Sequence, residues 1–328
     1  MALPLREIRS LLAESIKHTN FPVPISQAIK DQWAERRSIP RGGETVLYTG
    51  ALYQLMPYTK ALVARLEGLE EKRGVGLLLK VASGIGKVLD LSGIASKVVR
   101  KDTESYNNIL TSVATLLSKA GIDYGCLYDN DLYSGALLYD LGLLDDFAEH
   151  ARKVYLLMNE AGVRRAITVD PHTHHMLSTV FPTYIDDYDL EVISFLDLLS
   201  EKLPDPERKL SGDVVLHDPC IYGRFHGITE QPRELLARAG LECQEVRWSR
   251  EKTFCCGGLM ESIAPKLANY IAGERMAQLT EKGRTIVTLC PVCHVNLSRV
   301  APPDVEVRDL ALFLSEAWNV EQPAGRTL

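Results

Sequence analysis

Short apolar runs alternate with longer amphipathic segments along the chain. The runs are typical of buried strands and lie at Thr45–Tyr48, Ala166–Val169, Asp213–Leu216, Glu242–Trp248, Thr285–Leu289 and Val305–Arg308. Segments with helical periodicity lie at Lys60–Lys72, Thr103–Ala120, Val192–Leu203, Pro232–Ala239, Leu259–Leu279 and Leu310–Trp318. Strands that alternate with helices predict an α/β fold with mostly parallel sheets.

The same pattern divides the chain into three parts. Residues 1–44 are predicted to form an N-terminal helical arm, and residues 45–210 and 211–328 each combine strands with helices. The stretch Lys209–Gly212 is the predicted boundary between the last two parts. A helical insertion is predicted around residues 74–100. Its apolar segment 74–99, interrupted by charged residues, is interpreted as an amphipathic helix or hairpin, with docking to a partner or a membrane surface as alternatives.

The two larger parts also resemble each other in sequence. Three pairs of segments match in the same order, namely Gly50–Tyr53 with Pro219–Tyr222, Gly125-Cys126 with Cys255-Cys256, and Thr168–His174 with Thr288–His294. Ordered matches of this kind indicate an internal duplication. We therefore expect two pseudo-symmetric, Rossmann-like halves.

Composition narrows the class of protein. The 328 residues are 46% hydrophobic and 24% charged, which is typical of a folded globular chain. The formal net charge of −6 argues against nucleic-acid binding. The start of the sequence lacks the layout of a signal peptide, and no run of 18 apolar residues is present. We expect a cytoplasmic protein, with membrane association through a complex as an alternative, and therefore reduced or metal-bound thiols.

The cysteines supply the strongest chemical signal. Five of the seven form one pattern in the second half, at Cys220, Cys255, Cys256, Cys290 and Cys293, with 34 and 33 residues between the three groups. Each group follows a predicted strand or lies in a loop, and the carboxyl ends of parallel strands meet at one edge of a sheet. Thiolates select zinc, copper(I) or iron–sulfur clusters. Five exceed the four ligands of a structural zinc and of a cubane cluster, so the surplus favours a cluster of unusual geometry or a site with one thiolate free for redox chemistry. Cys243 lies on a predicted strand and is interpreted as a small buried residue.

This spacing resembles the cysteine-rich CCG domain, which occurs in the B-type and D-type subunits of heterodisulfide reductase and in several iron–sulfur oxidoreductases. The residues that carry the resemblance are Cys220, Cys255-Cys256-Gly257 and Cys290-Pro291-Val292-Cys293. The resemblance implies that the five cysteines bind a noncubane [4Fe-4S] cluster, with zinc as the alternative. The chain lacks a ferredoxin-type cysteine run, so electrons would come from partner subunits that carry iron–sulfur clusters or flavin.

The first half departs from the family pattern. Ala51, Gly125, Asp170 and Thr173 stand where cysteines are expected, and Cys126 is interpreted as the one that remains. If the halves face each other, His172 or His174 could deliver protons during thiol chemistry. A mononuclear metal held by Asp170, a histidine and Cys126 is a second hypothesis, and a decayed site is a third.

Two further groups of residues flank the second-half cysteines. His294 is interpreted as a hydrogen-bond donor to a sulfur. Arg224 and His226 could bind an anionic substrate tail or the loop backbone.

Three functions follow as hypotheses. The first is a subunit of a heterodisulfide reductase-like oxidoreductase complex, which performs thiol/disulfide or sulfane-sulfur chemistry at the cluster. The second is a non-catalytic electron-transfer subunit of a flavoprotein dehydrogenase or a quinone-linked complex. The third is a zinc-stabilised scaffold.

Overall fold

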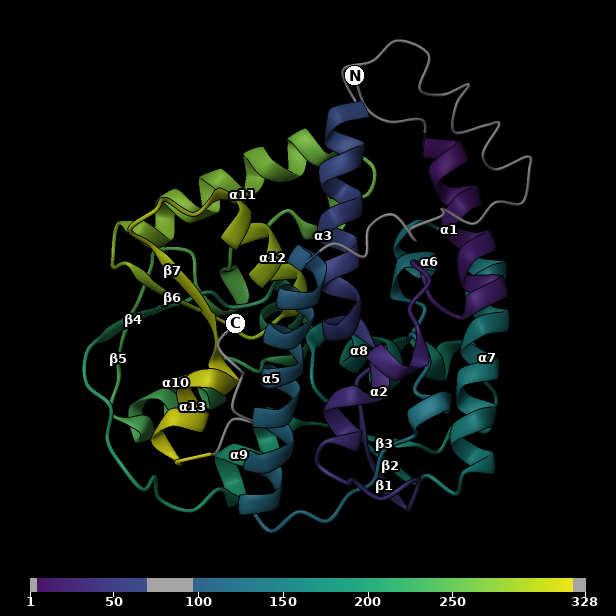
Figure 1. The fold of residues 1–328 in the computed structure, drawn as a ribbon, viewed down its shortest axis with the longest axis horizontal. Coiled ribbons are helices and arrows are strands. Elements are labelled where there is room, and N and C mark those ends of the chain that lie inside the picture. The colour runs from purple at the N-terminus through teal and green to yellow at the C-terminus, as the bar shows by residue number, and fades with distance from the viewer. Residues whose placement is uncertain (1–4, 70–96, 321–328) are drawn as a thin grey trace.

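The computed structural model describes residues 5–69 and 97–320 (Figure 1). Two helices, α1 (Leu5–Thr19) and α2 (Gln27–Glu35), precede the first strand, in agreement with the predicted helical arm. Helix α1 buries Ile8, Leu12 and Ile16, which the helical repeat places on one face. Most of the apolar segment 74–99 lies outside the described residues. Among the helices that are described, none has both the length and the hydropathy needed to cross a bilayer.

The first sheet has three parallel strands in the order β1-β2-β3. They are β1 (Thr45–Tyr48), β2 (Arg165–Thr168) and β3 (Glu191–Ser194). The register pairs Tyr48 with Thr168 and Thr168 with Ser194, so the three strands end level with one another. At the other edge of β1, Gly125 forms an isolated parallel bridge to Val46.

The second sheet has four parallel strands in the order β5-β4-β6-β7. They are β4 (Asp213–Leu216), β5 (Glu242–Gln244), β6 (Thr285–Thr288) and β7 (Glu306–Asp309). All pairings in both sheets are parallel, which confirms the predicted α/β fold class. In Figure 1 the two sheets lie on opposite sides of α5.

Helices connect and cover the strands. They are α3 (Leu52–Leu69), α5 (Lys97–Lys119), α6 (Ala136–Asp140), α7 (Leu144–Glu160), α8 (Pro171–His175), α9 (Phe195–Lys202), α10 (Glu230–Ala239), α11 (Pro265–Thr280), α12 (Pro291–Val300) and α13 (Leu310–Ala317). Short turns of 3-10 or π helix include η2 (Tyr128–Asn130), η5 (Tyr222–His226), η6 (Arg250–Lys252) and η7 (Gly258–Met260).

Three predicted helices have different bounds in the structure. The segment Val192–Leu203 divides into β3 and α9, because Ser194 caps the helix by accepting a hydrogen bond from the Leu196 amide. The segment Leu259–Leu279 divides into η7 and α11, which Pro265 begins. The helix predicted at Lys60–Lys72 corresponds to α3, which begins earlier, at Leu52, and contains Pro57. The apolar pattern therefore located these helical segments, but it did not identify the residues at which each helix begins or ends.

The two halves pack into one body. Helix α5 contacts α13, and α3 contacts α12, so helices from the first half cover the second. A reciprocal pair of tyrosines also crosses between them. Tyr53 of α3 donates to Asp309 at 3.0 Å, and Tyr222 of η5 lies 3.2 Å from Ser194 Oγ. Because Asp309 and Ser194 both cap the helix after the last strand of their sheet, the two contacts are pseudo-symmetric.

The crossed tyrosine contact yields a stability prediction. Tyr53→Phe should lower the free energy of unfolding by about 1–3 kcal/mol, because it leaves the fully buried Asp309 carboxyl without its hydroxyl partner. Tyr155→Phe is the control, since the Tyr155 hydroxyl bonds Asp189 in an exposed position. Urea unfolding of both variants checks the difference. Equal losses in the free energy of unfolding would show that the contact between the halves stabilises the protein no more than an exposed hydrogen bond does.

Candidate metal centre

The five cysteines of the CCG-like pattern come from three segments that meet near the carboxyl ends of the strands of the second sheet. Cys220 opens the helical turn after β4, Cys255 and Cys256 lie in the loop before η7, and Cys290 is the N-cap of α12, with Cys293 one turn later. Pro291 occupies the first position of α12, where a missing backbone N–H costs nothing. The i, i+3 spacing then puts Cys290 and Cys293 on one face of the helix.

The five thiols form a continuous chain of contacts. Cys255 hydrogen-bonds Cys220 and Cys256, Cys256 bonds Cys293, and Cys293 bonds Cys290. None of them forms a disulfide. All five line one pocket, here called the cysteine pocket, which encloses about 270 Å³ including its opening. Three remote segments of the sequence therefore present their sulfurs to one space.

The thiol pKa is lowered at Cys255 and Cys290 and raised at Cys220, Cys256 and Cys293. Hydrogen bonds from Cys220 and Cys256 lower the thiol pKa of Cys255, and the Gly257 amide, 3.3 Å from its sulfur, adds to this effect. The pKa of Cys290 is also lowered, because bonds from Cys293 and His172 outweigh the effect of burial. Donation to Cys255 raises the pKa of Cys220. The pocket is therefore built to hold thiolates next to thiols.

A tight turn allows two adjacent cysteines to face the same space. Adjacent side chains on a strand point to opposite faces, so a pair that converges requires a turn. Gly257, with φ of 81°, supplies this turn and is the N-cap of η7. A Cβ at this position would lie 2.7 Å from the Ala268 carbonyl oxygen. Glycine is therefore required here both for its backbone conformation and for space.

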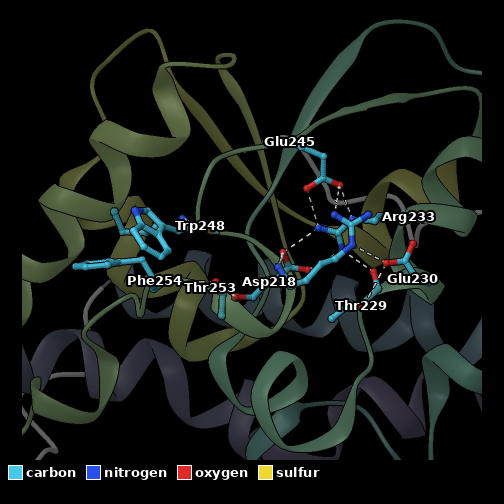
Figure 2. A network of polar contacts seen from close by, with 10 residues as sticks. Asp218, Thr229, Glu230, Arg233, Glu245, Trp248, Thr253 and Phe254 are labelled. Carbon is cyan, nitrogen blue, oxygen red and sulfur yellow. Dashed lines mark hydrogen bonds and ion pairs between the residues drawn. The ribbon is translucent and has the colours of Figure 1, made fainter.

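A buried polar network fixes the loop that carries Cys255 to the end of β4 (Figure 2). Arg233 binds both carboxylate oxygens of Asp218, at 2.7 and 2.9 Å, and also contacts Glu245. Asp218 accepts a further hydrogen bond from the Arg250 amide, and its backbone carbonyl accepts one from the Thr253 hydroxyl. Bidentate charged pairs of this kind are strong and directional. The network therefore sets the distance between the Cys220 and Cys255 segments.

A histidine and an arginine lie beside two of the pocket cysteines. His217 places a ring nitrogen within 4.8 Å of the sulfurs of Cys256 and Cys293. Burial lowers its pKa, so the ring is neutral, and Arg275 Nε donates to its Nδ1 at 3.0 Å. A neutral ring with Nδ1 occupied as an acceptor carries its proton on Nε2. Neither nitrogen then offers a free lone pair, so His217 fits a donor role toward sulfur and not a ligand role.

The structure separates the two histidines that the sequence proposed as catalytic. His172 hydrogen-bonds Cys290 and lines the cysteine pocket, although it belongs to the first half. Burial lowers its pKa, but Cys290, Asp140 and Asp170 outweigh this and raise it to about 9. His174 instead bonds Thr168 at 2.8 Å and packs against Tyr222, away from the sulfurs. Only His172 is in a position to act on a group in the pocket.

The sheet register corrects the interpretation of Cys126. Gly125 pairs with Val46 of β1, just as Gln244 of β5 pairs with Val215 of β4. Gly125 and Cys126 therefore occupy the place of β5 at the edge of the first sheet. They do not correspond to Cys255 and Cys256, and Cys126 is not a remnant of that pair.

The true counterpart of the Cys-Cys-Gly turn is Tyr133-Ser134-Gly135. Gly135 is the N-cap of α6 with φ of 81° and ψ of 4°, and Gly257 is the N-cap of η7 with φ of 81° and ψ of 1°. A Cβ built on Gly50 would lie 2.8 Å from Thr173 Oγ1 and 3.6 Å from the Ser134 amide nitrogen, so three segments converge here as well. The five cysteine positions thus correspond to Ala51, Tyr133, Ser134, Asp170 and Thr173. Comparing YSGALL with CCGGLM in the sequence would have found this match.

Asp170 replaces Cys290 in its structural role. Its carboxylate accepts a hydrogen bond from the Thr173 amide at 2.9 Å, and in the second half the Cys293 amide helps to lower the pKa of the Cys290 thiol. In the described part of the chain, Asp170, a histidine and Cys126 do not form the metal-binding group that the sequence suggested. Only His217, Cys256 and Cys293 bring three candidate ligand atoms within 4.8 Å of one another among the described residues.

Three other residues near the pocket have ordinary partners. Arg224 donates to the Thr253 carbonyl at 2.6 Å, so it binds the loop backbone. His226 lies 3.0 Å from His175, and His294 contacts the Tyr106 hydroxyl at 3.2 Å and the backbone of Val307. His294 therefore faces away from the sulfurs, in contrast to the role expected from its position after Cys293.

The remaining cysteine of the second half is in the strand predicted for it. Cys243 lies in β5, where it pairs with Val214 of β4, and it is only partly exposed. It does not line the cysteine pocket.

The matched family agrees with this geometry. Residues 214–298 match the cysteine-rich domain family, CCG. The match contains all five cysteines of the pocket.

Curated relatives with similar sequences are redox proteins by name. The chain is 28% identical over 65% of its length to the probable iron-sulfur-binding oxidoreductase FadF of Bacillus subtilis, of which it spans 32%. It is 26% identical over 69% to the EtfAB:quinone oxidoreductase of Syntrophomonas wolfei, of which it spans 33%. It is also 26% identical over 66% to the D-type subunit of the dihydromethanophenazine:CoB–CoM heterodisulfide reductase of Methanosarcina barkeri, of which it spans 58%. The expected resemblance to CCG proteins and to heterodisulfide reductase is confirmed.

The donor set of the CCG domain suits a thiolate-bound metal centre. Cys256, Cys290 and Cys293 are at most 3% exposed, and backbone amides already donate to two of the five sulfurs. A structural zinc takes four ligands, so one thiol would be left over. Five converging sulfurs and flanking N–H donors fit an iron–sulfur cluster.

The Gly257 turn yields a second prediction. Gly257→Ala should destabilise the protein by more than about 1 kcal/mol, because a left-handed residue gains a Cβ that meets backbone. Gly273→Ala is the matched control in the neighbouring helix α11, since a Cβ there meets nothing within 4 Å, and it should be neutral or stabilising. Thermal unfolding compares the two variants. A stable Gly257→Ala protein would show that the turn does not depend on glycine.

Proposed function

We propose that this chain is a subunit of a heterodisulfide reductase-like oxidoreductase complex. In this proposal Cys220, Cys255, Cys256, Cys290 and Cys293 bind a noncubane [4Fe-4S] cluster. The site performs thiol/disulfide or sulfane-sulfur redox chemistry, with electrons exchanged through iron–sulfur or flavin partner subunits. The names of the relatives and the CCG match support an iron–sulfur redox subunit. Since the chain spans only 32% of FadF and 58% of the Methanosarcina protein, the activities of these whole proteins enter as proposals.

One observation favours a catalytic site over a simple relay. The cysteine pocket adjoins a larger pocket between the halves, and four residues line both of them. His172 is one of these residues and contacts Cys290. A relay needs only a buried cluster near an interface. A substrate site needs access and a group that can move a proton, and the adjoining pocket and His172 support both requirements.

The proposed reaction needs a source of electrons and a source of protons. Reduction of a disulfide breaks one S–S bond, consumes two electrons and two protons, and releases two thiols. When bound, the cluster would supply the electrons that a reduced partner subunit delivers. His172 lies where it can give a proton to a sulfur that leaves the pocket, because it lines both pockets. In the oxidation of a thiol or a sulfane sulfur, electrons would pass to the partner subunit and protons would leave the sulfur.

The proposal assigns a role to each part of the chain. Residues 211–328 form the intact CCG domain, residues 45–210 form its degenerate counterpart, and residues 1–44 form the helical arm. The degenerate half binds no cluster, because Ala51, Tyr133, Ser134, Asp170 and Thr173 replace the five ligands. Its function is to supply His172 and to cover the cysteine pocket from the other side.

The second candidate function is electron transfer without catalysis. The name of the Syntrophomonas relative, an EtfAB:quinone oxidoreductase, favours it. In that case the cluster would relay electrons between a flavoprotein and a quinone-linked partner, and small thiols would leave its spectrum unchanged.

Substitution of single cysteines tests the ligand set. Cys255→Ser should abolish the cluster, because its sulfur lies between those of Cys220 and Cys256 in the chain of contacts. Cys243→Ser and Cys126→Ser are the controls and should keep it, since neither residue lines the cysteine pocket. Iron and acid-labile sulfide per chain, counted after anaerobic purification, should each be about four in the controls.

Other metal contents would contradict the proposal. About one zinc without sulfide would indicate a scaffold, and about eight irons would indicate a second cluster in the degenerate half. Loss of the cluster in Cys243→Ser would overturn the assignment of ligands. Electron paramagnetic resonance with and without a thiol separates catalysis from relay, since only a catalytic site should respond.

The donor role of His217 gives a further prediction. His217→Leu should lower the reduction potential of the centre and reduce iron retention about tenfold, because an N–H donor beside the sulfurs is lost. His294→Leu is the control, since its nitrogens contact Tyr106 and Val307. A redox titration followed by electron paramagnetic resonance measures the potential. An unchanged reduction potential in His217→Leu would show that His217 does not donate a hydrogen bond to the metal centre.

A further inference from the structure

A second pocket, here called the apolar pocket, lies beside the cysteine pocket. It encloses about 740 Å³ including its opening. Leu12 of α1, Met56 and Leu62 of α3, and Leu137 of α6 form one side. Gly258 and Leu259 of η7, with Val292 of α12, form the other. The pocket therefore lies between the helical arm, the degenerate half and the CCG domain.

The two pockets are adjacent. His172, Gly258, Leu259 and Val292 line both of them. A molecule in the apolar pocket would therefore contact the same side chains that border the cysteine sulfurs. This position distinguishes the apolar pocket from an ordinary packing defect in the core.

The lining favours an uncharged ligand over an anionic one. No Lys or Arg of the described chain lines the apolar pocket, whereas two carboxyl groups, Asp140 and Glu261, do. Burial raises the pKa of both carboxyls. Glu261 is already bonded to Asn296 and Arg299. The one lining side chain of the described chain with a raised basic pKa is His172, and Cys290, Asp140 and Asp170 already surround it. A phosphate, sulfonate or carboxylate would therefore lose its hydration without gaining an unpaired cation, which is costly.

The few free polar atoms mark where a polar group of the ligand would lie. His172 Nδ1 and Ser262 Oγ are buried and have no hydrogen-bond partner. Most other lining residues are aliphatic, for example Leu52, Leu55 and Val63. The lining therefore favours a ligand with an aliphatic chain and one small polar group near His172.

We propose that the apolar pocket binds an uncharged aliphatic thiol, or the disulfide made from it, as the substrate of this site. The sulfur points past His172 into the cysteine pocket, and the hydrocarbon tail fills the space between α1, α3 and α6. This inference deepens the proposed function and rests on it for the reaction, but not for the binding. The cysteine pocket encloses about 270 Å³ against about 740 Å³ for the apolar pocket, which favours a sulfur at the end of a chain over a ring.

Binding to the anaerobically purified full chain tests the proposal. The probes are butane-1-thiol, hexane-1-thiol and octane-1-thiol, with 2-mercaptoethanesulfonate as the charged comparison, and calorimetry measures the dissociation constants. Burial of the tail should tighten binding roughly fourfold for each added methylene. The sulfonate should bind far more weakly than the alkanethiols. Affinity that does not depend on chain length, or tight binding of the sulfonate, would overturn the proposal.

Two variants of neighbouring residues locate the site. Thr59 lines the apolar pocket, and Lys60 is exposed and does not. Thr59→Trp should fill the pocket and weaken octane-1-thiol at least about tenfold, whereas Lys60→Trp should leave it unchanged. Circular dichroism checks that both fold. If Thr59→Trp does not fold, Thr59→Asp serves instead, because a carboxylate in the pocket should weaken the same ligand.

Further outcomes separate this inference from the proposed function. If octane-1-thiol binds as expected but the spectrum of the iron centre does not change, the pocket assignment holds and the thiol chemistry fails. If the spectrum responds to thiols but the Thr59 variants have no effect, the chemistry holds and the pocket assignment fails. A decyl-quinone that competes with octane-1-thiol and binds more tightly would overturn the thiol class in favour of a quinone.

Discussion

Mutual repulsion among five sulfurs in one buried pocket is the constraint on which the rest of the structure depends. Five thiolates this close cannot all be charged without a metal, and the directions of their pKa shifts reflect this. The protein offsets the charge with groups fixed in place, namely the amides of Gly257 and Cys293 and the His172 side chain. Arg275 adds a buried guanidinium that orients His217. Most of the second half can be understood as a frame that holds these donors in place.

The first half is the same frame without the sulfurs. Its glycine turn at Gly135, its carboxylate N-cap at Asp170 and its cap at Ser194 repeat the geometry of the second half residue by residue. The positions of the five cysteines carry Ala51, Tyr133, Ser134, Asp170 and Thr173. In place of sulfurs, this half contributes a side chain across the interface. Here that contribution is His172, which reaches Cys290 in the other half.

The crossed contacts of Tyr53 and Tyr222 explain why the halves stay in register. Each tyrosine follows the first strand of its own half and contacts the helix cap after the last strand of the other. Any rotation of one half against the other would break both contacts. The same packing sets the shape of the apolar pocket, since α3 carries Tyr53 and also forms one wall. Stability and access to the sulfurs are therefore coupled through one helix.

The sequence by itself determined the fold class, the five cysteines and the fact of duplication. These properties depend on local patterns, because apolar runs specify buried strands and the cysteine spacing follows from the βα order of the chain. The tertiary structure decided which residues correspond between the halves. Cys126 looked like a remnant ligand, but the bridge between Gly125 and Val46 places it on a sheet edge. The structure also decided that His172 and not His174 faces the sulfurs, and that His217 and not His294 does so. Adjacent or nearby residues in a helical turn point in different directions, and only packing between the halves fixes which one meets the pocket.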